Sequence, residues 1–196
     1  MGRRQLFDTA DVVRRARDVF WDKGLEGTSM PELEQATGLA RSSLYHAFTS
    51  KRGLFDAAVQ DYLDSVIRPR LRVLVGPDAG PDAVLVYLRG LAGAIAALPE
   101  DSSRRGCLLL TCAAGPEAHD PALRAVVGDY RRELGDALAH ALALRVPAMG
   151  TELRERRALV LTSLVVSALL VARTDTDGAV ATLGAAVAQV QEWDRT

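Results

Sequence analysis

The stretch from Gly38 to Lys51 constrains the fold of this chain more than any other. Its sequence is Gly-Leu-Ala-Arg-Ser-Ser-Leu-Tyr-His-Ala-Phe-Thr-Ser-Lys. Glycine reaches positive φ at little cost, so Gly38 suits a turn that joins two helices at a steep angle. Leu39 and Leu44 are spaced to point inward, whereas Arg41 and its polar neighbours are left for an outer face. The stretch therefore predicts the turn and the second helix of a helix-turn-helix.

Helix start and stop signals also precede this stretch, and strand signals are nearly absent from the chain. Thr9 is expected to cap a first helix that Gly24 ends. Ser29 and Glu32 form a capping-box pattern that opens the second helix. These signals predict a three-helix head at the N-terminal end.

Helical patterns continue after the head. Ser50 is expected to cap a fourth helix that runs to about Ile67 and breaks near Pro69. The segment Gly76–Pro81 is the clearest linker-like break. Further helices are expected at about 82–98, 105–114, 120–145, 151–173 and 177–193. We therefore predict an all-α fold of about nine helices, with a larger C-terminal bundle.

Positions on both sides of the turn carry a family resemblance. Gly27-Thr28-Ser29-Met30 opens the second helix, and Leu54-Phe55 lie at the expected offset in the fourth. With the stretch 38–51, these positions are similar to the TetR family of bacterial transcription regulators. Two positions depart from the family pattern. Ala40 stands where Ser or Thr often caps the recognition helix, and Ala47 where His or Tyr often touches a phosphate.

The resemblance implies two domains and a function. Residues 6–66 would form the DNA-binding domain, with its helix-turn-helix at about 29–48. Residues 67–196 would form a ligand-binding and dimerisation domain. The protein would be a dimeric, sequence-specific DNA-binding regulator, more often a repressor, that a small ligand releases from a palindromic operator. A weaker similarity to such regulatory domains continues through residues 105–109 and 120–121.

The candidate DNA contacts lie on or beside the recognition helix. Arg41 near its start could fork onto O6 and N7 of guanine, and Ser42 is small enough to let the backbone approach. The resemblance implies phosphate contacts for Thr28, Ser43, Tyr45 and Lys51. It implies a contact with the DNA backbone or a thymine methyl for His46. The alternative is that Tyr45 and His46 only cover a surface helix and do not contact DNA. The candidates are Thr28, Arg41, Ser42, Ser43, Tyr45, His46 and Lys51.

Composition limits the class of protein. The formal net charge is −1, so the chain as a whole is not a polycation that binds polyanions. Its longest apolar stretch, Ala158–Ala172, is interrupted by polar residues and is shorter than the roughly 20 residues of a spanning helix. We expect a cytoplasmic protein with no membrane partner and no secretory signal. Arg3 and Arg4 form either a basic arm toward DNA or a solvated tail.

By resemblance, the C-terminal bundle holds the small-molecule effector. The side chains expected to line its cavity are mostly apolar, which favours a hydrophobic or aromatic compound. They are Leu85, Leu88, Leu109, Cys112, Tyr130 and Leu134.

The two cysteines, Cys107 and Cys112, give no disulfide framework. On one helix they would point about 140° apart, which is poor geometry for a disulfide or a shared metal. We expect each to be a small buried hydrophobe. The alternative is redox or electrophile sensing by Cys107, because Arg104 and Arg105 could lower its pKa.

No catalytic or cofactor motif is present in the sequence. Asp136 and His140 are four residues apart on one expected helix, and we interpret them as a solvated pair rather than half of a metal site. No nucleotide-binding glycine loop and no nucleophile motif occurs. We expect neither an enzyme nor a cofactor. The alternatives are a helical carrier or enzyme with a non-functional head, and a helical interaction module.

The last two expected helices are unusually apolar. Ala158–Ala172 is apolar nearly all round, and Val180–Val190 consists largely of small residues. A helix that is apolar on every side must be buried on every side, either within one subunit or between two. The family resemblance favours a dimer interface here. Its candidate residues are Leu159, Thr162, Val166, Leu169, Leu170, Gly184 and Val187.

Overall fold

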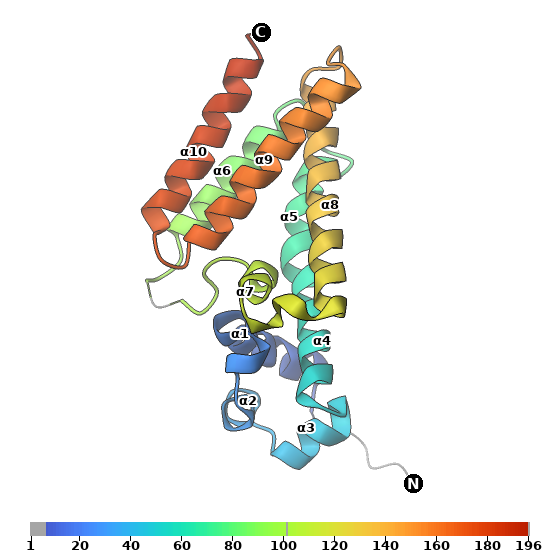
Figure 1. The fold of residues 1–196 in the computed structure, drawn as a ribbon, viewed down its shortest axis with the longest axis vertical. Helices are drawn as coiled ribbons and strands as arrows, with labels where there is room; N and C mark the ends of the chain where they lie inside the picture. Colours follow the sequence, from blue (N-terminus) through green and yellow to red (C-terminus); the bar gives the residue numbers. More distant parts are fainter. Residues whose placement is uncertain (1–6, 101, 196) are drawn as a thin grey trace.

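The computed structural model describes residues 7–100 and 102–195, which form an elongated, helical molecule (Figure 1). A small head lies at one end and contains α1 (Thr9–Gly27), α2 (Met30–Thr37) and α3 (Arg41–Phe48). The remaining helices form a taller bundle above it. No strand occurs in either described range, so the all-α prediction is confirmed.

The head helices pack around a small aromatic and aliphatic core. Phe20 of α1 meets Phe55 of the fourth helix edge to face, with ring centroids 5.2 Å apart. The α1 helix begins one residue earlier than predicted, because the side chain of Asp8 rather than Thr9 accepts a hydrogen bond from Ala10 N. Its regular helix is interrupted at Gly24, where φ is +71°. The expected stop at this glycine is therefore confirmed, and one short turn follows it.

A single rod connects the head to the bundle. It consists of α4 (Lys51–Tyr62), a π-helical turn η1 (Leu63–Ile67) and α5 (Arg68–Val75). The predicted break near Pro69 was wrong, because the rod continues to Val75. Pro69 stands in the first turn of α5, directly after the wider π turn, where its missing N–H costs little.

The bundle contains the remaining helices. After the predicted break at 76–81 come α6 (Ala83–Ala96), α7 (Leu108–Ala114), the 3₁₀ turn η2 (Pro116–His119), α8 (Pro121–Arg145), α9 (Thr151–Val171) and α10 (Thr176–Trp193). If the rod is counted as one helix, the described residues form nine helices, as predicted. Helix α10 packs against α6 and α9, and α8 packs against α5 and α9.

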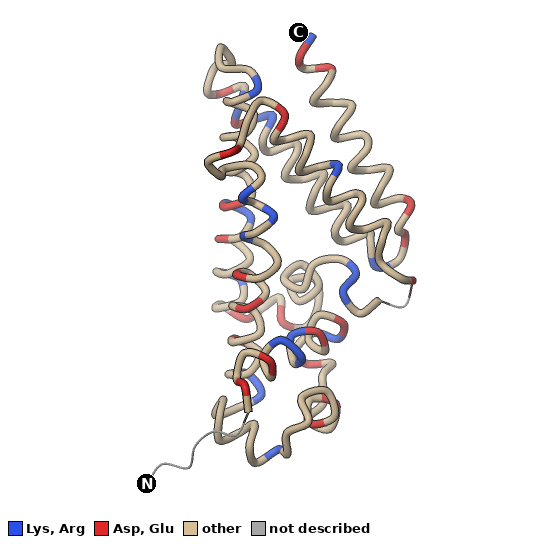
Figure 2. Tube along the Cα trace, turned by 180° about the vertical axis from the view of Figure 1, so that it is seen from behind, with Lys and Arg blue, Asp and Glu red and all other residues tan. Residues whose placement is uncertain are grey.

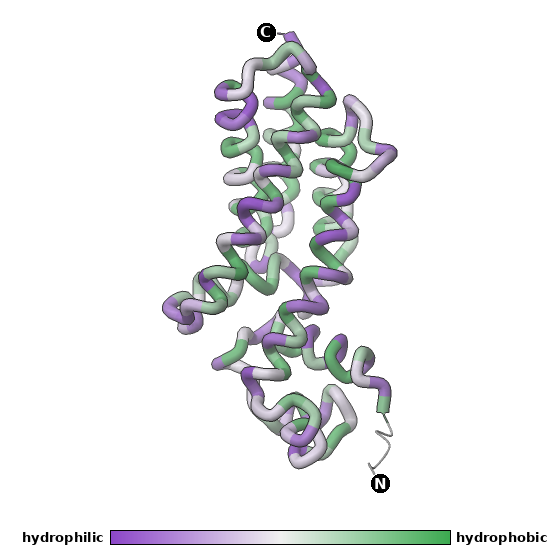
Figure 3. The backbone as a smooth tube through the Cα atoms, turned by 90° about the vertical axis from the view of Figure 1, so that its right-hand side faces the viewer, coloured by the Kyte–Doolittle hydropathy of each residue, from purple (hydrophilic) through white to green (hydrophobic). Residues whose placement is uncertain are grey.

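Hydropathy follows this packing. Along the helices of the bundle, hydrophilic and hydrophobic positions alternate at helical spacing (Figure 3). The buried set includes Leu88 of α6, Leu109 of α7, Leu138 of α8 and Leu161 of α9. One core therefore runs through the bundle and continues into the head. None of the helices within the described ranges is long and apolar enough to span a membrane.

Candidate DNA-binding head and its connection to the bundle

Helix α3 lies at the outer tip of the head, where the turn at Gly38 delivers it (Figure 1). Gly38 has a φ of +72°, and its N–H caps α2 by donating to Glu34 O at 2.9 Å. The following helix has no side-chain cap of its own, because Ala40 carries no oxygen. Glu34 of α2 takes over this task, since its Oε1 accepts the Arg41 N–H at 2.5 Å. The missing family cap is thus compensated by a residue that the sequence analysis did not single out.

The outer face of α3 presents the predicted polar side chains. Arg41, Ser42, Tyr45 and His46 are exposed and Ser43 is half-buried, while Leu44 holds the helix to the core. The Arg41 guanidinium stacks over the Tyr45 ring at 5.4 Å and donates to its hydroxyl at 3.4 Å. Helix α3 carries one arginine and no acidic residue (Figure 2). This face can donate hydrogen bonds to an anionic backbone and to base edges.

Two of the candidate phosphate contacts have other partners in the structure. Thr28 is buried, and its hydroxyl donates to Gly24 O at 2.6 Å, so it does not belong to the exposed face. The Lys51 ammonium is half-buried and donates to Thr28 O at 2.9 Å. Lys51 therefore joins the start of α4 to the turn before α2. Arg3 and Arg4 lie outside the described residues.

Several polar contacts join the head to the bundle. The Arg52 guanidinium of α4 binds both carboxylate oxygens of Asp120, the cap of α8, one of them at 3.0 Å. From the end of α9, Arg173 donates to Asp22 O at 2.7 Å and to Trp21 O at 3.1 Å. The two carbonyl groups that Arg173 binds lie two and three residues before Gly24, where the regular helix of α1 is interrupted.

Further contacts involve the end and the middle of α1. The buried Glu117 carboxylate of η2 accepts the Glu26 N–H at 2.7 Å. At the middle of α1, the buried Arg17 donates to Asp61 and to Ser65, each at 2.8 Å. Ser65 belongs to the π turn of the rod. The head is therefore connected to the bundle by directional bonds as well as by the shared rod.

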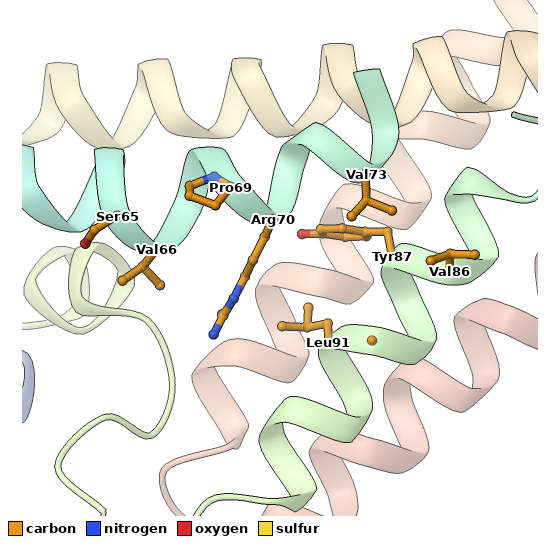
Figure 4. Close-up of a pocket in the computed structure, with 9 residues that line it drawn as sticks. Ser65, Val66, Pro69, Arg70, Val73, Val86, Tyr87 and Leu91 are labelled. Atoms are coloured by element: carbon orange, nitrogen blue, oxygen red, sulfur yellow. The ribbon is translucent and has the colours of Figure 1, made fainter. Parts of the chain in front are cut away.

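The predicted ligand-lining residues lie inside the bundle. All six are buried: Leu85, Leu88, Leu109, Cys112, Tyr130 and Leu134. They come from α6, α7 and α8, which the fold does bring together. None of them lines the opening between α5 and α6, which is lined instead by their neighbours, such as Tyr87 and Leu91 (Figure 4). A cavity lined by these six side chains therefore stays a prediction.

The cysteines are buried, as expected. Cys107 is not on the helix but at its cap position, because α7 begins at Leu108. Burial raises the pKa of the Cys107 thiol and raises that of Cys112 to about 12. The alternative, in which Arg104 and Arg105 lower the pKa of Cys107, is not supported, since Arg104 pairs with Asp18 and Arg105 donates to Pro99 O. The thiols are thus held in the protonated form that reacts poorly.

The candidate dimer residues fall into two groups. Leu159 is 59% exposed and Leu170 is 42% exposed, and Val166 lies on the same face of α9. On α10, Gly184 is exposed and Val187 is half-buried. The structure corrects the interface prediction for Thr162 and Leu169, because both are buried within the single chain. The Thr162 hydroxyl donates to Ala158 O at 2.8 Å. They face α8 and the bundle core rather than the outside.

Within the described ranges, no group of three or more His, Cys, Asp or Glu residues is arranged to hold a metal ion. Asp136 and His140 are both exposed on α8.

Comparison with known proteins identifies the chain. Residues 12–58 match the family model for bacterial regulatory proteins of the tetR family. An uncharacterised HTH-type transcriptional regulator, YezE of Bacillus subtilis, is 34% identical over 143 residues, which are 72% of each chain. The HTH-type transcriptional repressor BdcR of Escherichia coli is 25% identical over 74% of this chain and 71% of its own.

Solved structures agree. A cysteine mutant of the TetR family transcriptional regulator CifR, complexed with 26-base-pair operator DNA, has a TM-score of 0.80 and 28% identity. The match covers 95% of this chain and 98% of that one. Regulators of this family are generally not enzymes. The exposed face of α3, the helix-turn-helix around Gly38 and these matches lead to one conclusion: the chain belongs to the TetR family and is a DNA-binding transcriptional regulator.

Proposed function

We propose that the protein is a cytoplasmic, homodimeric repressor that a small molecule releases from a palindromic operator. In this proposal residues 6–66 bind DNA and residues 67–196 bind the effector and the second subunit. The single observation that carries it is the exposed polar face of α3, held at the tip of the head by Leu44 and by the Glu34 cap. The names of relatives such as BdcR support the repressor role.

Two heads are needed for tight and specific binding. One head offers the groove only the eight residues of α3. In a symmetric dimer, two recognition helices about 34–36 Å apart address successive major grooves on one side of the duplex. Arg41 reads a guanine in each half-site, and Tyr45, Ser43 and Lys51 set the register through phosphates. Lys51 exchanges its bond to Thr28 O for a phosphate when DNA binds.

Ligand control acts on the spacing between the heads. The rod α4–η1–α5 belongs to both parts of the molecule, and Arg52, Arg173 and Glu117 connect the head to bundle elements. A ligand releases DNA only if it binds the DNA-incompetent arrangement more tightly. Occupation of the bundle that displaces α5 therefore moves the head as a unit.

Substitutions on the head test the proposal. We expect Arg41→Ala to weaken operator binding by roughly 1–3 kcal/mol and to relax preference at one base pair in each half-site. Lys51→Ala should weaken binding to all sequences alike, because phosphate contacts carry no sequence code. The matched control is Arg89→Ala on α6, an exposed arginine far from the head. Fluorescence anisotropy with operator and scrambled duplexes measures both effects, and equal losses for all three variants would refute the assignment.

A further inference from the structure

A furrow runs along the outside of the bundle between α5 and α6 (Figure 4). It encloses about 540 Å³, which is within the range of small-molecule sites. Its walls are mainly apolar and include Val66, Val73, Val86 and Leu91. Val86 is 53% exposed and Val73 is also exposed, so this surface leaves aliphatic side chains in water. Clustered exposed apolar side chains of this kind are typical of a binding site.

The furrow continues toward the turn that follows α5. A second hollow toward the turn at 76–82 shares Pro69, Val73 and Val86 with the first. The two hollows adjoin along these three apolar side chains, and Arg72, Asp78 and Asp82 also line the second one. An elongated apolar body fits this shape better than a compact polar one.

One charged side chain reaches into the furrow. Arg70 projects from α5 into it, with Tyr87 beside the base of its side chain (Figure 4). No carboxylate among the described residues lies within ion-pair distance of Arg70, and no acidic residue lines the part of the furrow that contains Arg70. Its neighbour Arg68, in contrast, pairs with Asp64 and Glu133. The positive charge of Arg70 also opposes the rise in the pKa of Tyr87 that burial causes.

A glycine in the middle of α6 keeps the furrow open. Gly90 is exposed and lines the furrow, and a Cβ placed on it would meet no atom within 4 Å. Packing within the chain therefore does not require a glycine there, although a mid-helix glycine costs about 1 kcal/mol relative to alanine. The missing side chain leaves open space at this point of the furrow lining.

We propose that this furrow is the effector site and that the effector is a monocarboxylate with an elongated apolar body. The carboxylate pairs with the Arg70 guanidinium, whose planar fork matches two carboxylate oxygens. The body lies along Val66, Val73, Val86 and Leu91, over the space left by Gly90. The inference rests on the proposed function, because it names the ligand of the proposed regulatory bundle. It replaces the expectation of a purely apolar ligand by an amphipathic, anionic one.

Calorimetric titration of the full-length protein tests the proposal. The probes are octanoate and 4-butylbenzoate, each paired with its neutral amide. We expect at least one carboxylate to bind the wild type at least ten times more tightly than its amide. Arg70→Gln should remove most of this difference, and Gly90→Leu should weaken both forms at least tenfold. The matched controls are Arg89→Gln and Gly93→Leu, on exposed positions of α6 outside the furrow lining, and they should bind like the wild type.

Three results would overturn the inference: no binding of either carboxylate, equal binding of acid and amide, or unchanged binding in Gly90→Leu. A fourth is dissociation of the dimer by Gly90→Leu in sedimentation, which would assign the furrow to a contact between copies. Operator binding without probe is measured on the same samples. If the wild type binds operator but no carboxylate, only this inference fails. If it binds no operator, the proposed function fails independently.

Discussion

At the scale of single residues, the recognition helix depends on a cap that it does not carry. Ala40 has the extended backbone of a capping residue, with φ −65° and ψ 151°, but no side-chain acceptor. The carboxylate of Glu34 supplies that acceptor from α2. The bond that caps α3 therefore comes from a neighbouring helix rather than from the preceding residue. It fixes the start of α3 relative to α2 and thereby orients Arg41.

Replacing this residue should weaken the head. We expect Glu34→Ala to lower the free energy of unfolding by about 1 kcal/mol, the usual cost of a lost cap. Adding Ala40→Ser to that variant should recover part of the loss, because serine restores a local acceptor. Urea unfolding followed by circular dichroism measures the change. Gln35→Ala, an exposed substitution on the same helix, is the control, and a Glu34→Ala protein as stable as this control would contradict the cap.

At the scale of helices, the ion pair between Arg52 and Asp120 connects the start of α4 with the start of α8. The hydrogen bonds from Arg52, with a further one from Leu123 N, hold the pKa of Asp120 well below its usual range. The unfolded value is about 3.9. A carboxylate with a lowered folded pKa stabilises the fold above the unfolded value, and this contribution is lost as the pH falls toward the folded value.

Acid titration of an isosteric variant tests this connection. Asp120→Asn keeps an oxygen that can cap α8 at Leu123 N but removes the charge. The wild type should be more stable than the variant at pH 7, and the difference should shrink as the pH falls below about 4. Thermal unfolding at pH 7, 4 and 3 measures it. The pair Lys23–Glu32, which lowers the pKa of Glu32 to about 2, is present in both proteins. Its effect on stability therefore cancels in the difference between them. A difference that stays constant with pH would contradict the ion pair.

Local signals explain how much of the fold was predictable. The capping box at Ser29 and Glu32 forms as expected, because both partners lie within one turn of the chain. The segment Gly76–Pro81 breaks the chain for the same local reason. The break predicted at Pro69 was wrong, since a π turn that ends two residues before it makes room for the proline ring, and Arg17 of α1 donates a hydrogen bond to Ser65 of that turn. Contacts between distant segments leave no pattern in the sequence.

The same limit applies to the candidate sites. The polar face of α3 was predictable from spacing, and its exposure agrees with that prediction. The burial of Thr28 was not predictable, because it depends on the short turn after Gly24, and its phosphate contact stays a prediction. The furrow was missed because its walls come from two helices whose relative placement the sequence does not reveal. Gly90 was the available signal, a glycine inside an otherwise good helix.

At the scale of the whole molecule, α9 and α10 leave an apolar face uncovered. Leu159, Ser163, Val166 and Leu170 recur at the spacing of one helix face, and Leu159 and Leu170 are exposed. The middle of α10, residues 178–191, carries no charge (Figure 2). Its outer residues, such as Gly184 and Ala188, are small, which allows close approach of a second helix pair. This face can bury its apolar surface in a dimer.

A charge on this face should separate the subunits. We expect Leu170→Glu to leave each chain folded, because Leu170 is already exposed in the single chain, and to convert the dimer into a monomer by burying an unpaired charge in the interface. Sedimentation at micromolar concentration should give about half the wild-type mass. The control is Val75→Glu, because Val75 is an exposed apolar residue at the end of α5, outside this face. A Leu170→Glu protein that stays dimeric would place the interface elsewhere.

The central claim is that two copies of α3, each led by Arg41, address one palindrome. Selection of bound duplexes from random DNA, followed by sequencing, tests it most directly. We predict that the wild type enriches an inverted repeat with half-site centres about one helical turn apart, and that Arg41→Ala enriches the same repeat with one base pair relaxed in each half. Enrichment of no sequence, or of a motif that Arg41→Ala leaves unchanged, would contradict the account.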